Sequence, residues 1–356
     1  MAFLFVACQS GAEKALKAEL AREHSGLKFA FSRPGFVTFK GDEESFGRFE
    51  LDSVFARAYG ESLVTLKQAA SGAGAQGVLE AARGLKERVK LSAPLRLHVF
   101  ERDQHPPGEE PQGFRPGVLA DQALRMIRAE DREGLFAAES QATVPGELVL
   151  DVIVVDENEW WVGWHEHSSR HHGSPGGNPR IALPKEAPSR AYLKLEEALL
   201  WSRAPIKKGD RAVEIGSAPG GACFALLERG LEVFGIDPGE MDPVVLRNPR
   251  YRHLSKSVMF VEEDELPSKV DWLLTDMNAE PSVALYAVER IAGMCPGLSG
   301  VLLTIKLNEW SLAEHIPEYL DRLRKNLGLS RIRATQLAHN RREICVYGLT
   351  RKGMAR

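Results

Sequence analysis

Short apolar runs alternate with helix-forming segments through the second half of the chain, and this alternation restricts the fold more than any other feature. The runs contain four to six residues and lie at Arg211–Ile215, Val233–Ile236, Val258–Val261, Asp271–Thr275 and Val301–Lys306. Buried strands of this length, separated by helices, indicate a doubly wound parallel sheet in an α/β fold. We predict helices at Arg190–Trp201, from Ser282 onward and at Leu312–Leu327. A terminal antiparallel hairpin is predicted with its arms at Ile332–Gln336 and Ile344–Tyr347.

The first of these strands ends in a glycine-rich turn, Gly216-Ser-Ala-Pro-Gly-Gly221, which leads directly into a helix. Glycine lets a backbone approach a ligand closely, and the amides at a helix start attract electron-rich groups. Asp237 ends the next strand, where an acid can bind a ribose diol. The turn and the acid together predict a nucleoside pocket at the carboxyl end of the sheet.

S-Adenosylmethionine is the ligand that this pocket favours. The turn lacks the Gly-x-Gly-x-x-Gly pattern of dinucleotide-binding enzymes, although a nicotinamide-dependent oxidoreductase remains an alternative. It also lacks the Gly-Lys-Ser/Thr sequence that would hold a triphosphate. We expect Asp237 to bind the ribose hydroxyls and Asp264, in an acidic segment after the third strand, to accept from the adenine amino group.

Four charged residues fall at positions where charge is costly or near a strand end. Lys306 ends an apolar strand, Asp276 follows the neighbouring strand, Lys194 lies among apolar residues of a helix, and Glu343 opens the last strand. A lysine beside another cation loses its proton more easily, and could then act as a base, while nearby carboxylates limit that shift. Any one of the four could instead be a structural ion pair. Their common position at one sheet edge favours a reaction site.

The first half contains two further α/β segments without an obvious nucleophile or phosphate loop, and we interpret it as a scaffold or binding module. The predicted strands are Phe3–Ala7, Leu27–Phe31, Gly35–Phe39, Ser62–Leu66, Leu95–Phe100, Leu148–Val155 and Trp160–His165, and the helices are Ala12–Glu23, Gln76–Val89 and Val118–Glu130. Ser168–Asn178, rich in Gly, Ser, His and Arg, is typical of a linker.

Histidines gather near this linker, at positions 165, 167, 171 and 172. Their spacing matches no established metal site, so we expect a loop that exposes them and no bound metal. The four cysteines are scattered without a Cys-x-x-Cys pair, which favours a reducing compartment, and no apolar run is long enough for a bilayer. We therefore expect a cytoplasmic protein without a membrane partner.

Charge does not identify a nucleic-acid partner by itself. The net charge is −3, with 19 Lys and Arg against 25 Asp and Glu up to Trp160 and 27 against 24 beyond it. The later half also carries local clusters of basic residues. These clusters are compatible with a phosphate-lined track, but solvated surface explains each of them equally well.

Several segments resemble the FtsJ-like 2′-O-ribose RNA methyltransferases. They are Ser189-Arg-Ala-Tyr-Leu-Lys194-Leu-Glu-Glu, Glu214-Ile-Gly-Ser-Ala-Pro-Gly-Gly221, Thr275-Asp276-Met, Thr304-Ile-Lys306 and Arg342-Glu343-Ile-Cys-Val-Tyr. The Lys-Asp-Lys-Glu tetrad of that family matches Lys194, Asp276, Lys306 and Glu343. The likeness is closest to the THUMP-containing members that methylate a cytidine ribose of bacterial 23S ribosomal RNA, and it extends to Val6–Lys14, Ser53–Arg57 and Pro184–Arg190.

The resemblance implies a function, a domain plan and roles for residues. It implies S-adenosylmethionine-dependent 2′-O-methylation of RNA, with Lys306 as the proton acceptor. The implied domains are a ferredoxin-like part at 1–60, a THUMP RNA-binding domain at 61–167, a linker at 168–186 and a Rossmann-like methyltransferase domain at 187–356. The implied cofactor-binding residues are Ser189, Gly216, Ala218, Pro219, Gly220, Gly221, Asp237, Asp264 and Asp276.

The chain departs from the family pattern at three places near the cofactor. Glu214 replaces the usual Asp, Ala222-Cys223 replaces Trp followed by Ser or Thr, and Asn278 replaces a small residue. These changes put the cofactor affinity in question and leave the tetrad intact.

Two further alternatives remain at this point: a non-catalytic RNA-binding protein with a vestigial methyltransferase fold, and methylation of a base or a protein. The modified nucleotide, the choice between free RNA and a precursor particle, and the oligomeric state stay open, with a monomer expected.

Overall fold

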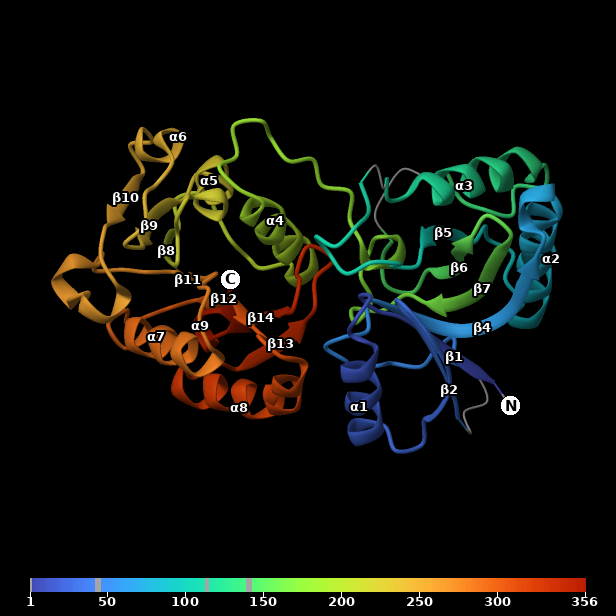
Figure 1. Ribbon diagram of the computed structural model, residues 1–356, viewed down its shortest axis with the longest axis horizontal. Coiled ribbons are helices and arrows are strands. Elements are labelled where there is room, and N and C mark those ends of the chain that lie inside the picture. The colour runs from blue at the N-terminus through green and yellow to red at the C-terminus, as the bar shows by residue number, and fades with distance from the viewer. Residues whose placement is uncertain (1, 42–45, 113–114, 139–142) are drawn as a thin grey trace. The chain divides into compact units, whose positions relative to one another are not determined.

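The chain folds into two compact units, which are described separately. A computed structural model describes residues 2–41, 46–112, 115–138 and 143–356, and the remaining residues lie outside this description (Figure 1). Contacts divide the chain into Met1–Pro179 and Arg180–Arg356.

The first unit is built on one seven-stranded sheet with the order β2-β3-β1-β4-β7-β6-β5. Neighbouring strands are antiparallel except for the parallel pair β5 and β6. Strand β4 pairs with β1 on one side and β7 on the other, so a single sheet runs through the unit. The strands are β1 (Phe3–Ala7), β2 (Lys28–Arg33), β3 (Phe36–Lys40), β4 (Ala58–Lys67), β5 (Arg96–Glu101), β6 (Leu148–Asp156) and β7 (Glu159–Glu166).

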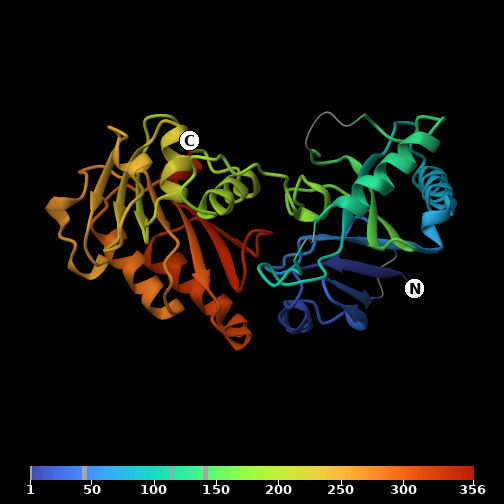
Figure 2. The ribbon, with the colours of Figure 1, turned by 45° about the horizontal axis from the view of Figure 1, so that its top comes forward.

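In the part of this unit that the structure describes, three α-helices cover the sheet. Helices α2 and α3 pack against each other, and the apolar side chains between them and the sheet form a core of the unit. Helix α1 lies beside the other half of the sheet, next to β2 (Figure 2). The helices are α1 (Glu13–Glu23), α2 (Ala73–Val89) and α3 (Val118–Glu130), with short 3-10 turns η1 (Ala69–Ser71) and η2 (Pro175–Gly177).

The second unit contains the predicted doubly wound sheet, with the order β10-β9-β8-β11-β12-β14-β13. The first five strands in this order are parallel, and the terminal hairpin extends them: β14 pairs antiparallel with β12, and β13 pairs antiparallel with β14. This confirms the α/β class and the closing hairpin. The strands are β8 (Arg211–Ile215), β9 (Glu232–Ile236), β10 (Tyr251–Leu254), β11 (Trp272–Thr275), β12 (Gly300–Lys306), β13 (Arg331–Thr335) and β14 (Glu343–Leu349).

Helices cover both faces of this sheet (Figure 1). Alternate strand residues point to opposite faces, so Trp272 and Leu274 pack with α4 and α5 while Leu273 faces the other side, where α7 contacts β11 and β12. The helices are α4 (Ala191–Ser202), α5 (Gly221–Glu228), α6 (Pro243–Leu246), α7 (Pro281–Gly293), α8 (Ile316–Asn326) and α9 (Arg351–Met354), with 3-10 turns η3 (Val258–Phe260), η4 (Glu263–Glu265) and η5 (Trp310–His315).

One predicted strand is wrong. The apolar run Val258–Val261 forms the 3-10 turn η3, because the Ser257 hydroxyl accepts from the Met259 N–H and starts a turn there. The third strand of the sheet is instead β10, which pairs with β9 at the edge of the sheet.

The predicted helix Leu312–Leu327 is also divided. Its first part is the 3-10 turn η5, and α8 begins at Ile316 with Pro317 in its first turn. Proline lacks an N–H and suits the first turn of a helix, which fixes the start of α8 at this point.

All four cysteines are buried, and none of them forms a disulfide. Among the residues described, no helix has both the length and the apolar composition needed to cross a membrane.

Candidate active site

Two lysines and two carboxylates form a closed group of ion pairs in the second unit. Lys194 Nζ lies 3.2 Å from Asp276 Oδ2 and 2.6 Å from Glu343 Oε1. Lys306 Nζ lies 3.1 Å from Asp276 Oδ1 and also contacts Glu343 Oε2. Each cation therefore touches both anions, and the four side chains named from the sequence do lie together.

The sheet explains why these four residues meet. Asp276 follows β11 and Lys306 ends β12, and these parallel strands are neighbours, so their carboxyl ends reach the same edge. Strand β14 runs antiparallel to β12 with Glu343 opposite Lys306. Lys194 comes from helix α4, which covers this end of the sheet.

Electrostatics within the group favour the charged forms. Burial alone would lower the pKa of Lys306, but the carboxylates of Asp276 and Glu343 outweigh it and hold the pKa above its ordinary value. Burial would likewise raise the pKa of Glu343, and the charges of Lys194 and Lys306 lower it instead. The limit that nearby carboxylates were expected to set is therefore the stronger effect here, because Asp276 and Glu343 together raise the pKa of Lys306 in spite of its burial.

The glycine-rich turn lies at the same edge, between β8 and α5. Gly216 and Gly220 have φ angles of +79° and +113°, in the region that favours glycine, and the Ala218–Pro219 peptide bond is cis. Helix α5 begins at Gly221, so its first amides are available at the turn.

Close packing leaves no space for side chains at two of these glycines. A Cβ on Gly221 would lie 2.3 Å from Ser189 Oγ and 2.8 Å from its carbonyl oxygen. A Cβ on Gly216 would lie 3.0 Å from Met277 Cα. The turn therefore rests against the segments that carry Ser189 and Asp276.

Asp237 follows β9 and holds the turn from the other side. Its Oδ2 accepts from the Ala218 N–H at 3.1 Å and its Oδ1 from the Gly239 N–H at 2.7 Å. A carboxylate has about four acceptor positions, so both oxygens can still accept from ligand hydroxyls. The cradle of amides and this acid fit the adenosyl part of S-adenosylmethionine.

Asp264 lies elsewhere than predicted. It is exposed on the 3-10 turn η4 and does not follow a strand of the sheet. Strand β10, which takes the third place in the sheet, ends at Leu254. The expected contact of Asp264 with adenine assumed that this residue follows the third strand of the sheet, and the structure does not place it there.

A buried acid lies beside the turn. Burial raises the pKa of Glu214 to about 8, and its carboxyl group accepts from the Cys223 thiol at 2.8 Å. The two departures from the family pattern at Glu214 and Cys223 therefore contact each other. A small cavity of about 30 Å³ adjoins Glu214 and is lined among others by Lys194 and Asp276.

Two buried polar residues beside the tetrad were not predicted from the sequence. Glu197 and Asn340 are both 0% exposed, on α4 and on the β13–β14 connection. Glu197 could have been suspected, since it lies one helical turn after Lys194, whereas nothing in the sequence pattern marks Asn340.

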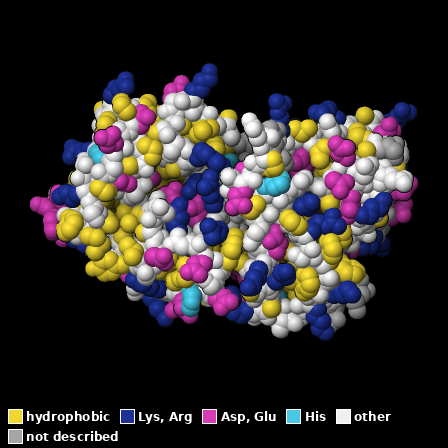
Figure 3. Space-filling view, in the orientation of Figure 1, with side chains coloured by type: hydrophobic (Ala, Val, Ile, Leu, Met, Phe, Trp, Pro, Cys, Tyr) yellow, Lys and Arg dark blue, Asp and Glu magenta, His cyan; other side chains and the backbone are white. Residues whose placement is uncertain are grey.

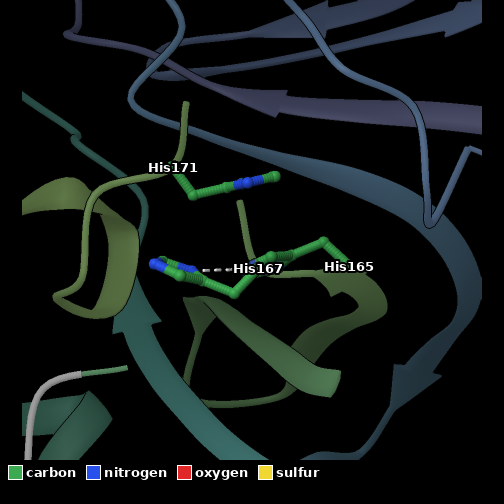
Figure 4. Close-up of side chains that lie close together, drawn as sticks. All are labelled: His165, His167 and His171. Atoms are coloured by element: carbon green, nitrogen blue, oxygen red, sulfur yellow. Dashed lines mark hydrogen bonds between the residues drawn. The ribbon is translucent and has the colours of Figure 1, made fainter. Parts of the chain in front are cut away.

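His165 and His167 are buried, and neither His171 nor His172 is exposed, so the expectation of a loop that exposes these histidines is wrong. His165 and His167 are 3% and 1% exposed, and ring nitrogens of His165, His167 and His171 lie within 4.8 Å of one another (Figure 4). His165 Nδ1 lies 2.6 Å from the buried Asp151 carboxylate, and its Nε2 lies 3.4 Å from His167 Nδ1.

Ring geometry argues against a metal at this cluster. The His165 and His171 rings stack at 4.2 Å with an angle of 16° between their planes, whereas a nitrogen ligand directs its lone pair within the ring plane. His171 Nδ1 also accepts from the Ser168 N–H at 3.1 Å, which leaves the proton of the neutral ring on Nε2. His165 thus packs against His171 and lies within hydrogen-bond distance of Asp151 and His167.

Surface charge on the drawn face is mixed. Lys and Arg side chains are interspersed with Asp and Glu over both units, without one continuous basic band (Figure 3). This agrees with the small net charge of the chain.

Known proteins resemble the chain over one domain and over nearly its whole length. Residues 187–311 match the FtsJ-like methyltransferase family. A ribosomal RNA large subunit methyltransferase M from Histophilus somni (strain 129Pt) is 27% identical over 96% of this chain and 97% of its own length. Proteins of the same name from Chromohalobacter salexigens and Pasteurella multocida are 33% and 31% identical, over 48% and 56% of this chain and 50% and 57% of their own lengths.

Among solved structures, TrmN from Thermus thermophilus aligns with 98% of this chain and 100% of its own chain, at 14% identity and a TM-score of 0.34. A score this low does not bear on function.

Proposed function

We propose that this chain, whose residues 187–311 match the FtsJ-like methyltransferase family, transfers a methyl group from S-adenosylmethionine to a ribose 2′-hydroxyl of ribosomal RNA. The observation that carries the proposal is the closed group of Lys194, Asp276, Lys306 and Glu343 beside the glycine-rich turn. We further propose a cytidine of 23S ribosomal RNA as the target, in line with the names of the relatives and the resemblance noted above. This substrate would place the enzyme in the cytoplasm.

The chemistry requires removal of one proton. S-Adenosylmethionine supplies, when bound, a methyl group already activated on a sulfonium. A ribose 2′-hydroxyl is a weak nucleophile, so Lys306 Nζ accepts its proton as the oxygen attacks. Lys194 and Asp276 hold the hydroxyl, and Glu343 orients both lysines. Alignment of the reacting groups supplies much of the remaining acceleration.

The cofactor is held by backbone more than by side chains in this proposal. The amides of the turn from Gly216 to Gly221, together with Ser189 and Asp237, surround it, and Asp276 lies where the two halves of the site meet. Asp264 keeps a role only if its exposed turn moves toward the adenine.

The first unit is proposed to bind structured RNA. Its ferredoxin-like part at 1–60 and THUMP domain at 61–167 would share the single sheet, since β4 pairs with strands of both. The 2′-hydroxyl itself accounts for the choice of RNA over DNA.

The rival functions are less well supported. A nicotinamide-dependent oxidoreductase has no reason to match the FtsJ-like family over 187–311. A vestigial, non-catalytic fold has no reason to keep four charged side chains partly or fully removed from water, where each costs free energy unless it is paired.

Substitution of Lys306 tests the proposal. We expect Lys306→Ala to lower methyl transfer to unmodified 23S ribosomal RNA by at least about 100-fold, because a positioned base contributes that much or more. S-Adenosylmethionine binding, measured by calorimetry, should persist. Lys325→Ala is the matched control, since that lysine is exposed on α8, with 71% of its side chain accessible.

Two outcomes would contradict different parts of this proposal. Unchanged turnover by Lys306→Ala would remove the assigned base. Mapping of 2′-O-methyl groups across ribosomal RNA with and without the gene tests the substrate, and an identical map would remove it.

A further inference from the structure

A buried carboxylate on α4 ties down the loop that carries one member of the tetrad. Glu197 Oε1 accepts from the Ala338 N–H at 2.7 Å, and Oε2 accepts from the His339 N–H at 2.9 Å. The same Oε2 lies 2.7 Å from His339 Nδ1. Glu197 is 0% exposed, so these three partners replace the water that its charge would otherwise require.

Asn340 connects this loop to the tetrad. Its Oδ1 accepts from the Leu337 N–H at 2.9 Å, and its Nδ2 donates to Glu343 Oε1 at 3.2 Å. The Arg341 N–H donates to the same Oε1 at 3.4 Å. The conformation of residues 337–341 therefore decides where Glu343 Oε1 lies.

Glu343 in turn holds both lysines. Its Oε1 lies 2.6 Å from Lys194 Nζ, and its Oε2 contacts Lys306. Lys194 and Glu197 are three residues apart on α4, so they share one face of the helix. Helix α4 thus supplies Lys194 itself. Through Glu197 and the loop 337–341, the same helix also positions Glu343, which Lys194 contacts.

We propose that Glu197 is a positioning residue that acts through the loop 337–341 and Asn340 on Glu343. The inference rests on the proposed function, because the reaction it serves is methyl transfer at Lys306. Glu197 touches neither Lys306 nor Asp276 through any contact described above, and its effect on the reaction has to pass through the loop.

Glu197→Gln is the informative variant. Glutamine keeps the size of the side chain but turns an N–H₂ group toward one of the donors from the loop, so at least one hydrogen bond becomes a repulsive contact. Because a displacement of about 1 Å at a catalytic group can cost about 100-fold in rate, we expect kcat to fall by about tenfold or more with little change in the KM for S-adenosylmethionine.

Asp210→Asn is the matched control. Asp210 is another buried acid of the second unit, and it accepts from the Lys207 N–H and from Trp272 Nε1. It precedes β8, at the opposite end of the sheet from the tetrad. This variant should lower the unfolding temperature without changing kcat.

A double variant separates positioning from general damage to the fold. In single-turnover assays, Glu197→Gln should slow transfer strongly in the native background and hardly at all in a Glu343→Gln background, since its path ends at Glu343. Hydrogen exchange of the 337–341 amides provides a second readout that needs no turnover, and Glu197→Gln should accelerate exchange at Ala338 and His339.

The outcomes are distinguishable. Equal slowing in both backgrounds, or unchanged exchange in the loop, would overturn the positioning role even where the native enzyme methylates RNA. Absence of transfer by the native enzyme would instead overturn the proposed function, and the exchange experiment would still decide whether Glu197 fixes the loop.

Discussion

Lys306 combines a proposed role as proton acceptor with surroundings that favour its protonated form. The carboxylates of Asp276 and Glu343 raise its pKa although burial alone would lower it. These carboxylates fix the position of Nζ, and the same contacts reduce the fraction of neutral amine near pH 7. The contacts that position the Lys306 amine thus also keep most of it protonated. The pH dependence of the reaction should reveal this effect.

We expect the single-turnover rate to rise with pH throughout the range from about 7 to 9. Protonated Lys306 cannot accept a proton, and its pKa lies above this range, so each pH unit increases the neutral fraction by about tenfold. The measurement is transfer of labelled methyl groups to RNA at saturating S-adenosylmethionine. A rate that stays constant across this range would contradict proton transfer to Lys306.

At the scale of elements, the close approach of α5 to α4 shapes the cofactor turn. Gly221 begins α5, and its α-carbon lies against Ser189 and the Tyr192 amide at the start of α4. Any side chain at this position has to push the two helix starts apart. The starts of α4 and α5 can therefore lie this close only because Gly221 has no Cβ atom.

Gly221→Ala should weaken S-adenosylmethionine binding by about tenfold and destabilise the fold by about 1–3 kcal/mol, as overpacking of a tight contact does. Isothermal calorimetry and thermal unfolding measure the two effects. Gly293→Ala, at the end of α7, is the control, because a Cβ there meets nothing within 4 Å and it should change neither. Native affinity in Gly221→Ala would show that this contact does not shape the turn.

The strands of the central sheet could be predicted because continuous apolar runs reflect burial on both faces. Edge strand β10 could not, since Arg252 and His253 interrupt its apolar pattern, and the nearby apolar run at Val258 was mistaken for it. The tetrad could be located from strand ends together with a family resemblance. The spacing of Glu197 from Lys194 could have drawn attention to it, but its partners could not be predicted, because they lie in a loop about 140 residues further along the chain. Asn340 could not be predicted either, since its contacts with Leu337 and Glu343 depend on the conformation of that loop.

On the scale of the whole molecule, each apolar core of the described residues lies within a single unit. One core lies within residues 195–349, and the others lie within residues 5–164. The boundary between the units falls at Pro179 and Arg180, between the buried histidines and α4. Each unit therefore buries its own apolar surface, which is the usual requirement for folding alone.

A fragment of residues 180–356 should fold and bind S-adenosylmethionine within a few-fold of the full chain, yet methylate ribosomal RNA poorly. The reciprocal fragment, 1–179, should bind RNA with an affinity that falls as salt increases. Calorimetry, methyl transfer and filter binding measure these properties. Full activity of the 180–356 fragment would contradict the role proposed for the first unit.

The four buried cysteines have a practical consequence for labelling. Burial is the largest cause that raises the pKa of Cys8, Cys223, Cys295 and Cys345, so each thiol stays protonated and shielded while the protein is folded. Maleimides and iodoacetamides react with the thiolate, and they should leave the native protein almost unmodified. A cysteine introduced at an exposed position would then carry a fluorophore alone, without removal of the natural thiols. The appearance of additional labelled sites would in turn report unfolding.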